Sequence, residues 1–171
     1  MPVFSKTPAN IREHTKEFDI AVIGTVGKSH RERLKIVNRI YRKYKGKYKF
    51  FVYLYSNEEG LDTSLPVFTV KLPYDEYISV LQKSKCVLDI AIHGQKGPTT
   101  RFNDALSTKT KVMTTNRNIR KYPYCTSNIL ILNKYTLSIP ATFLDSPYDE
   151  TDLQYMTLVL WAKSLLTEKD G

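Results

Sequence analysis

Short runs of apolar residues alternate with stretches of helical periodicity along almost the whole chain. The apolar runs are rich in β-branched and aromatic side chains, which predicts strands at residues 18–24, 49–55, 67–72, 85–92, 111–115 and 128–132. Between the strands, apolar residues recur every three or four positions. This spacing predicts helices at residues 30–45 and 73–84, a helix through residues 105 and 106, and a last helix beyond residue 151.

Strands that alternate with helices predict βαβ units with parallel pairing and right-handed crossovers. We therefore expect an α/β fold: a doubly wound, mostly parallel, six-stranded Rossmann-like sheet with helices on both faces. The nearly continuous apolar run KCVLDIAI at residues 85–92 is typical of a strand that is buried on both faces. Such sheets bind ligands at the carboxyl ends of their strands, where the strand order reverses, and we expect the first and fourth strands to flank that point. Two capping-box patterns, Ser29 with Glu32 and Thr151 with Gln154, predict where the first and last helices begin.

The chain has 171 residues, of which 42% are hydrophobic, and this suffices for one well-buried core. We expect a polar leader or linker remnant at residues 1–17 and a single domain at residues 18–171 that ends in the C-terminal helix. No apolar stretch approaches the roughly 18 residues of a membrane span, and the N-terminus lacks the apolar core of a secretory signal. We therefore expect a cytoplasmic protein in which Cys86 and Cys125 are reduced, since their spacing suits neither a metal site nor a disulfide framework.

The formal net charge of +9 favours anionic partners such as nucleotide phosphates, nucleic acid or an acidic membrane surface. Much of the excess lies between residues 28 and 49, where Glu32 alone opposes Arg31, Arg33, Lys35, Arg39, Arg42, Lys43, Lys45 and Lys47. A solvated helix face followed by a basic loop explains this region equally well.

The stretch HGQKGPTTRFNDAL at residues 93–106 follows the fourth predicted strand and opens a helix. Pro98 suits the first helical position, because the N–H group there has no intrahelical partner. The free amides beyond it, together with Thr99, Thr100 and Arg101, can converge on an anion. An ordinary strand-to-helix turn capped by threonine is the alternative interpretation.

The first predicted strand also leads into a glycine-bearing turn, IGTVGKSHRER, in which Lys28 and Arg31 follow Gly24 and Gly27. This turn matches neither the dinucleotide-binding pattern nor the P-loop pattern. If both turns face one crevice, however, their donors suit a diphosphate. Asp104, one turn inside the second helix, can then accept hydrogen bonds from a ribose diol; the alternative is a solvent-exposed acid in the first helical turn.

Three consecutive motifs carry a resemblance to a known family. They are YDEYISVLQKSKCVLDI (74–90), HGQKGPTTRFNDAL (93–106) and KVMTTNRNIRKY (111–122). In this order they resemble the C-terminal, donor-binding half of GT-B glycosyltransferases, most closely the bacterial enzymes that build capsular and lipopolysaccharide sugar chains. The resemblance extends from about residue 16 to about residue 147.

The resemblance implies that residues 93–101 cradle the diphosphate and the donor sugar, and that residues 72–74 lie near the base. Asp104 stands where the family usually has a ribose-binding glutamate, and Lys96 replaces a second glutamate of many retaining members. The donor-sugar contacts and the choice between retention and inversion therefore remain open. The expected nucleotide-sugar-binding residues are Gly24, Thr25, Gly27, Lys28, Arg31, Leu72, Tyr74, His93, Gly94, Gln95, Gly97, Thr99, Thr100, Arg101 and Asp104.

The resemblance further implies a metal-independent glycosyltransferase that uses no cofactor and takes a nucleoside-diphosphate sugar, UDP- or GDP-linked, as donor. Helix amides and the side chains of Arg101, Lys28 and Arg31 would neutralise the charge of the leaving diphosphate. We assign no catalytic residue, because a base would normally come from an N-terminal acceptor-binding domain beyond these residues. The expected acceptor is a polysaccharide or a lipid-linked glycan.

Two other hypotheses use the basic region at residues 28–49. One is a non-catalytic nucleic-acid-binding module in which Tyr41, Tyr44 and Tyr48 stack on bases. The other, which is compatible with a glycosyltransferase, is peripheral contact between the basic helix and the anionic inner face of the membrane.

Overall fold

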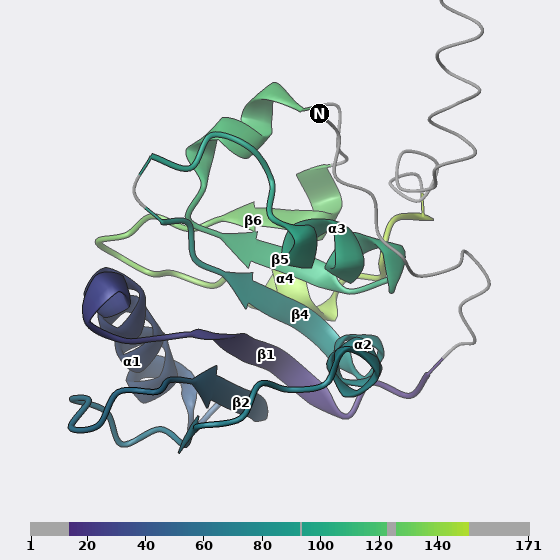
Figure 1. Ribbon diagram of the computed structural model, residues 1–171. Helices are drawn as coiled ribbons and strands as arrows, with labels where there is room; N and C mark the ends of the chain where they lie inside the picture. Colours follow the sequence, from purple (N-terminus) through teal and green to yellow (C-terminus); the bar gives the residue numbers. More distant parts are fainter. Residues whose placement is uncertain (1–13, 93, 123–125, 151–171) are drawn as a thin grey trace, which may run out of the picture.

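The computed structural model describes residues 14–92, 94–122 and 126–150, which form an α/β domain around a six-stranded, all-parallel sheet (Figure 1). The strands are β1 (Phe18–Thr25), β2 (Phe50–Tyr55), β3 (Val67–Phe68), β4 (Ser84–Asp89), β5 (Lys111–Thr114) and β6 (Ile129–Ile131). The α-helices are α1 (Arg31–Tyr44), α2 (Tyr74–Gln82), α3 (Thr100–Ser107) and α4 (Ala141–Asp145). Short 3-10 turns are η1 (Lys28–His30), η2 (Arg117–Lys121) and η3 (Thr126–Asn128).

The order of the strands in the sheet is β3-β2-β1-β4-β5-β6. The chain first builds outward from β1 to β3, then returns to the other side of β1 and builds outward again from β4 to β6. The order therefore reverses between β1 and β4, as the sequence predicts, and a doubly wound Rossmann-like fold is confirmed.

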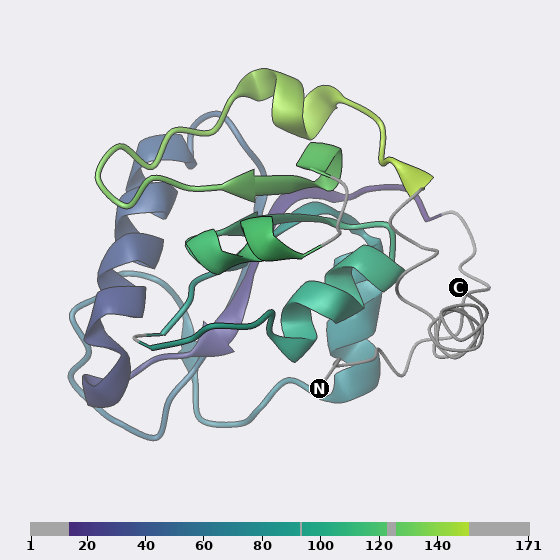
Figure 2. The same cartoon turned by 90° about the horizontal axis from the view of Figure 1, so that it is seen from above.

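The alternation of side chains along the strands gives the sheet two buried faces. On one face, Ile20 and Val22 of β1 pack in a cluster with residues of α1 and with Leu144 of α4. On the other face, Ala21 of β1 packs in a cluster with residues of α2 and α3, among them Phe102. Figure 2 shows α2 and α3 side by side on this second face. Since successive residues of a strand point to opposite faces, a strand with helices on both faces needs apolar residues in succession, which explains the run from Ile20 to Ile23 in β1.

Two strands are shorter in the structure than the sequence predicts. The strand at residues 85–92 ends at Asp89, because the amide of Ala91 donates to Thr115 Oγ1 (3.0 Å) and that of Ile92 to Gln95 Oε1 (3.3 Å), both side-chain atoms. The strand at residues 67–72 ends at Phe68, because its partner β2 ends at the paired residue Tyr55. The remaining strand boundaries agree within one residue or two.

Some predicted helix starts are wrong. Ser29 lies inside η1, and His30 precedes α1 without a side-chain capping bond, so the Ser29–Glu32 capping box does not form. Helix α3 begins at Thr100, and Pro98 therefore precedes the helix instead of occupying its first position. The five-residue helix α4 is too short for periodicity to predict it. The expected last helix, with Thr151 and Gln154, lies outside the described residues.

The free thiol of Cys86 is fully buried in the core, and burial raises its pKa. Cys125 lies outside the described residues. None of the helices between residues 14 and 150 combines the length and the apolar character that a membrane span requires.

Candidate functional site

A cavity of about 310 Å³ opens where β1 ends, beside the reversal in strand order. Its walls come from the end of β1, from β2, from the segment before α2, and from the first turns of α2 and α3. The lining residues are Ile23, Gly24, Thr25, Tyr53, Tyr55, Lys71, Leu72, Tyr74, Tyr77, Thr100, Arg101 and Asp104.

The cavity brings together predicted site residues from three separate segments of the chain. They are Gly24 and Thr25 at the end of β1, Leu72 and Tyr74 before and within α2, and Thr100, Arg101 and Asp104 in α3. The end of β1 and the first turn of α3, the helix that follows β4, therefore meet at one edge of the sheet, which is the edge where parallel sheets bind their ligands.

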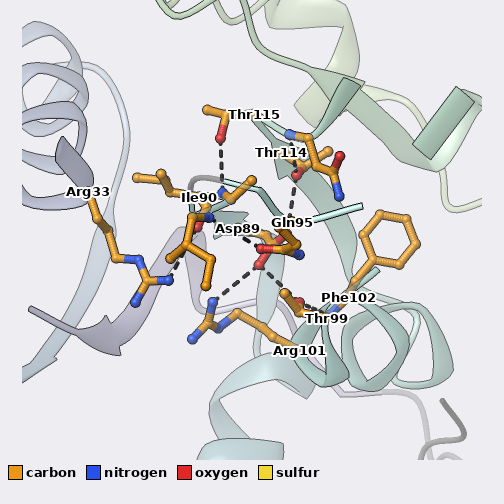
Figure 3. Close-up of polar contacts among 12 residues, drawn as sticks. Arg33, Asp89, Ile90, Gln95, Thr99, Arg101, Phe102, Thr114 and Thr115 are labelled. Carbon is orange, nitrogen blue, oxygen red and sulfur yellow. Dashed lines mark hydrogen bonds and ion pairs between the residues drawn. The ribbon is translucent and has the colours of Figure 1, made fainter. Parts of the chain in front are cut away.

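Arg101 lies at the meeting point of β1, β4 and α3. Its Nη1 atom donates to Asp89 Oδ1 at 3.2 Å, while Asp89 is 1% exposed and Arg101 is 20% exposed (Figure 3). A Cβ atom at residue 24 would lie 3.4 Å from Arg101 Nη2, so glycine at that position gives the guanidinium room beside β1. The arrangement presents a positive charge to the cavity from a fixed position.

Asp89, at the end of β4, fixes this arrangement by accepting three hydrogen bonds. Besides Arg101, Thr99 Oγ1 donates to Oδ1 at 3.0 Å and Thr114 Oγ1 donates to Oδ2 at 3.2 Å. Thr99 in turn accepts from the N–H group of Phe102 at 3.1 Å and thereby caps α3. The Thr99 hydroxyl is thus bonded inside the protein and lies outside the cavity lining, whereas Thr100 and Arg101 line the cavity.

A second guanidinium, that of Arg33 in α1, connects the end of β1 with the residue that follows β4. Its Nη1 atom donates to the carbonyl of Thr25 (2.8 Å) and its Nη2 atom to that of Ile90 (3.4 Å; Figure 3). Burial lowers the pKa of Arg33, the positive charge of Arg101 lowers it further, and Asp89 opposes both. The Nε atoms of Arg33 and Arg101 are both buried and have no hydrogen-bond partner among the described residues. The negative charge of Asp89 lies near both guanidinium groups. Since one carboxylate faces two positive charges, an additional anion in the cavity would be favoured beside Arg101.

The sequence interpretation misses Asp89 and Arg33. Asp89 is an acid inside an otherwise apolar run, and a carboxylate in a strand buried on both faces needs a partner, which is the signal that could have identified it. Arg33 gives no comparable signal, because it is one of many basic residues along α1.

One helical turn after Arg101, the cavity lining combines an acid with tyrosines. Asp104 is 2% exposed, so the interpretation of this residue as a solvent-exposed acid is wrong. The Tyr74 hydroxyl donates to Asp104 Oδ1 at 3.3 Å. Burial raises the pKa of Tyr77, and the negative charge of Asp104 raises it further. Tyr53, which also lines the cavity, stacks face to face on Phe68, with ring centroids 4.1 Å apart.

Side chains that follow β5 hold the loop between β4 and α3 by hydrogen bonds. The loop residues Gly94, Gln95 and Gly97 do not line the cavity. Asn116 Nδ2 donates to the Gly97 carbonyl at 2.9 Å, Gln95 Nε2 donates to the same carbonyl at 3.0 Å, and Asn118 Nδ2 donates to the Gln95 carbonyl at 3.3 Å. Gly94 has a φ of 79° and is likewise absent from the lining. His93 lies outside the described residues.

Gly27, Lys28 and Arg31 line a different cavity, between α1 and the loop at residues 59–62. The main-chain amide of Lys28 donates to Glu58 Oε2 at 2.8 Å. The structure therefore separates these three residues from the group around Arg101, and a carboxylate of the protein itself contacts the turn after β1.

Gly27 should be intolerant of a side chain. Its φ is 152° and its ψ is −171°, a region open essentially to glycine alone, and a Cβ atom would lie 2.7 Å from Glu58 Oε1. We expect Gly27→Ala to lower the free energy of unfolding by at least about 1 kcal/mol in urea titrations. Gly46→Ala is the matched control, because a Cβ atom there has nothing within 4 Å. Equal stability of the two variants would contradict this account.

The stacking hypothesis for nucleic acid does not fit the tyrosines of α1. Tyr44 is buried, and its hydroxyl donates to the Leu137 carbonyl (3.1 Å) and accepts from the Ile139 amide (2.9 Å). Tyr41 packs edge-on against Phe50. These rings belong to the core and are not arranged as a platform for bases.

Among the described residues, no cluster of three or more His, Cys, Asp or Glu side chains is placed to hold a metal ion.

No protein-family model matches this sequence, and no curated protein sequence does. Among solved structures, the fold is similar to the GtfA/B complex, a glycosyltransferase complex, with a TM-score of 0.50 and 8% sequence identity. This match covers 99% of the present chain and 40% of the other, so the chain spans less than half of that protein's length. The match with homoserine dehydrogenase from S. aureus covers 61% of the present chain and 27% of the dehydrogenase chain, with a TM-score of 0.35 and 14% sequence identity. At 8% identity the likeness to the GtfA/B complex shows a shared fold and nothing finer.

Proposed function

We propose that the cavity beside the reversal in strand order binds the nucleoside and diphosphate of a nucleotide sugar. The chain would then be the donor-binding domain of a GT-B glycosyltransferase that transfers the sugar to a polysaccharide or lipid-linked acceptor. The observation that carries this proposal is the grouping of Gly24, Arg101 and Asp104 around one cavity.

The end of the cavity beside Arg101 suits the diphosphate. The guanidinium is held by Asp89 at 3.2 Å and retains donors toward Gly24 and the cavity. Thr100, the first residue of α3, also lines the cavity beside Arg101. A guanidinium that is already oriented loses little entropy when it binds a phosphate, and charge-assisted hydrogen bonds of this type are the strong ones.

The end beside Asp104 suits the nucleoside. A buried carboxylate can accept hydrogen bonds from both hydroxyl groups of a ribose, and the rings of Tyr53, Tyr55 and Tyr74 offer apolar surface to the base. A volume of about 310 Å³ lies at the lower end of the range for ligand pockets. The donor sugar would therefore extend out of the cavity, toward an acceptor-binding domain.

The reaction follows from the positive end of the cavity. When the bond between the anomeric carbon and the diphosphate breaks, negative charge grows on the diphosphate, and Arg101 together with the amides at the start of α3 stabilises it without a metal ion. The base that activates the acceptor would come from the acceptor-binding domain.

Calorimetry with UDP and GDP tests the proposal. We expect saturable binding of at least one of them below millimolar concentration, and we expect Asp104→Asn to raise its Kd roughly tenfold, because one charge-assisted hydrogen bond is weakened. The 2′,3′-dideoxy analogue lacks the ribose diol, so its Kd should be high and insensitive to Asp104→Asn.

Glu76→Gln provides the matched control, since Glu76 is an exposed acid of α2 that does not line the cavity. Absence of saturable binding to either nucleotide would refute the proposed function. Equal effects of Asp104→Asn on UDP and on its dideoxy analogue would remove Asp104 from the ribose site.

A further inference from the structure

A second cavity, of about 450 Å³, lies between α1 and the loop at residues 59–62. None of its lining residues lines the cavity around Arg101. We refer to it as the α1 groove. Its volume falls within the range of small-molecule sites, and it differs from the first cavity in the chemistry of its walls.

The α1 groove is strongly basic. Positions three or four residues apart lie on one face of a helix, and this spacing relates the cationic residues of the lining, which are Lys28, Arg31, Lys35, Arg39 and Arg42. Two exposed acids, Glu59 and Asp62, lie on the opposite wall and oppose this charge only in part.

Most of these cations have no anionic partner among the residues that the structure describes. Arg39 donates to the carbonyls of Lys134 (3.1 Å) and Tyr135 (2.7 Å). In the described part of the chain, the side chains of Lys28, Arg31, Lys35 and Arg42 form neither an ion pair nor a hydrogen bond. Like charges four residues apart destabilise a helix, so an unneutralised row of them inside a concave groove favours an anionic ligand.

The walls of the groove narrow the class of ligand. No aromatic side chain lines it among the described residues, so a nucleic acid base would find no stacking partner, whereas Leu34 and Leu61 add apolar surface. The cations from residue 31 to residue 42 extend over about 16 Å of helix, which is more than one phosphate group can contact. Guanidinium groups bind phosphate in a bidentate manner, and lysine binds it as a point charge.

We propose that the α1 groove binds a ligand that carries at least two phosphate groups on a non-aromatic carrier. This phosphate chemistry can be presented by a free oligophosphate compound or by phospholipid headgroups at a membrane surface. The site is independent of the proposed nucleotide site.

Two binding assays test the proposal and separate the two sources of phosphate. One is calorimetric titration with tripolyphosphate. The other is sedimentation with vesicles of phosphatidylglycerol and phosphatidylcholine in equal parts, compared with vesicles of phosphatidylcholine alone. The triple variant Arg31→Gln, Lys35→Gln, Arg42→Gln removes the charge of exposed groove residues. The triple variant Lys45→Gln, Lys47→Gln, Lys49→Gln removes the same charge from exposed positions beyond the groove.

We expect saturable binding in at least one assay, weakened at least about tenfold by the groove variant, which corresponds to the loss of about one charge-assisted contact. The control variant should change the affinity less than about threefold, because distant surface charges are screened. Equal losses in both variants would reduce the effect to general electrostatics and overturn the proposal, as would an absence of saturable binding in both assays. Far-UV circular dichroism checks the fold of both variants, and UDP titration reports on the other cavity, so each proposal can fail separately.

Discussion

Replacing Arg101 with methionine is expected to weaken nucleoside diphosphate binding by about 1.5–3 kcal/mol, which is roughly a 10- to 150-fold rise in Kd. Methionine keeps much of the length and apolar bulk of arginine and removes its charge and its donors. The measurement is calorimetric titration of UDP and GDP against the wild-type and variant proteins.

The magnitude follows from the surroundings of Arg101. The side chain is only 20% exposed and is bonded to a carboxylate that is 1% exposed, so water screens its charge weakly. Its guanidinium lies beside Gly24, another residue of the cavity lining. A diphosphate there would contact a fixed guanidinium and the first amides of α3 together, and the helix dipole alone is worth only about 0.3–1 kcal/mol.

Lys71→Met is the matched control for the loss of one positive charge from the cavity lining. Lys71 is exposed, and its Nζ atom lies over the ring of Tyr55, 5.4 Å from the ring centroid. We expect its replacement to raise the Kd less than about threefold, since an exposed charge is screened by solvent. If the two variants behave alike, Arg101 has no specific role in binding the diphosphate.

The sheet could be predicted from the sequence because its determinants are local or general. The apolar runs at residues 18–24 and 85–92 have the composition of central strands, and right-handed crossovers leave few arrangements for six alternating strands and helices. The same rules place the turns after β1 and β4 at one edge. Predicting that Gly24 and Arg101 approach each other required nothing beyond this topology.

The details of the site depend on contacts between distant segments, which the sequence does not specify locally. Glu58 reaches the amide of Lys28 across 30 residues of sequence, and this contact removes the turn after β1 from the expected diphosphate site. Asp89 meets donors from α3 and β5 only after the sheet has formed. Strand ends are similarly set by their neighbours, as when β3 stops beside the last residue of β2.

Asp89→Asn is expected to produce the largest loss of stability, about 3–5 kcal/mol in the free energy of unfolding. Asparagine preserves the shape of the side chain, so the loss reports the charge and the acceptor atoms. The substituted amide group would turn donors toward the hydroxyl groups of Thr99 and Thr114 or toward Arg101, which are donors to the carboxylate in the native protein. Urea titration followed by circular dichroism measures the loss.

Asp19→Asn provides the comparison, because Asp19 forms an ion pair with Lys85 at 2.7 Å in a more exposed position, with exposed fractions of 22% and 39%. Exposed pairs contribute little, and we expect this variant to lose about 1 kcal/mol or less. A loss for Asp89→Asn no greater than that for Asp19→Asn would contradict the role of Asp89 as the centre of the hydrogen-bond group.

The double variant Asp89→Asn, Arg101→Met identifies the cause of the loss. If the cost of Asp89→Asn arises mainly from leaving the guanidinium of Arg101 half-buried without a counter charge, removing Arg101 as well relieves part of it. The double variant should then be more stable than the sum of the single variants predicts, by about 1–3 kcal/mol. Additive losses would instead attribute the effect of Asp89 to the bonds from Thr99 and Thr114, which hold α3 against β4 and β5. Asp89 also opposes the lowering of the Arg33 pKa that burial and Arg101 cause, so Arg33 still lacks this counter charge in the double variant and the relief should remain incomplete.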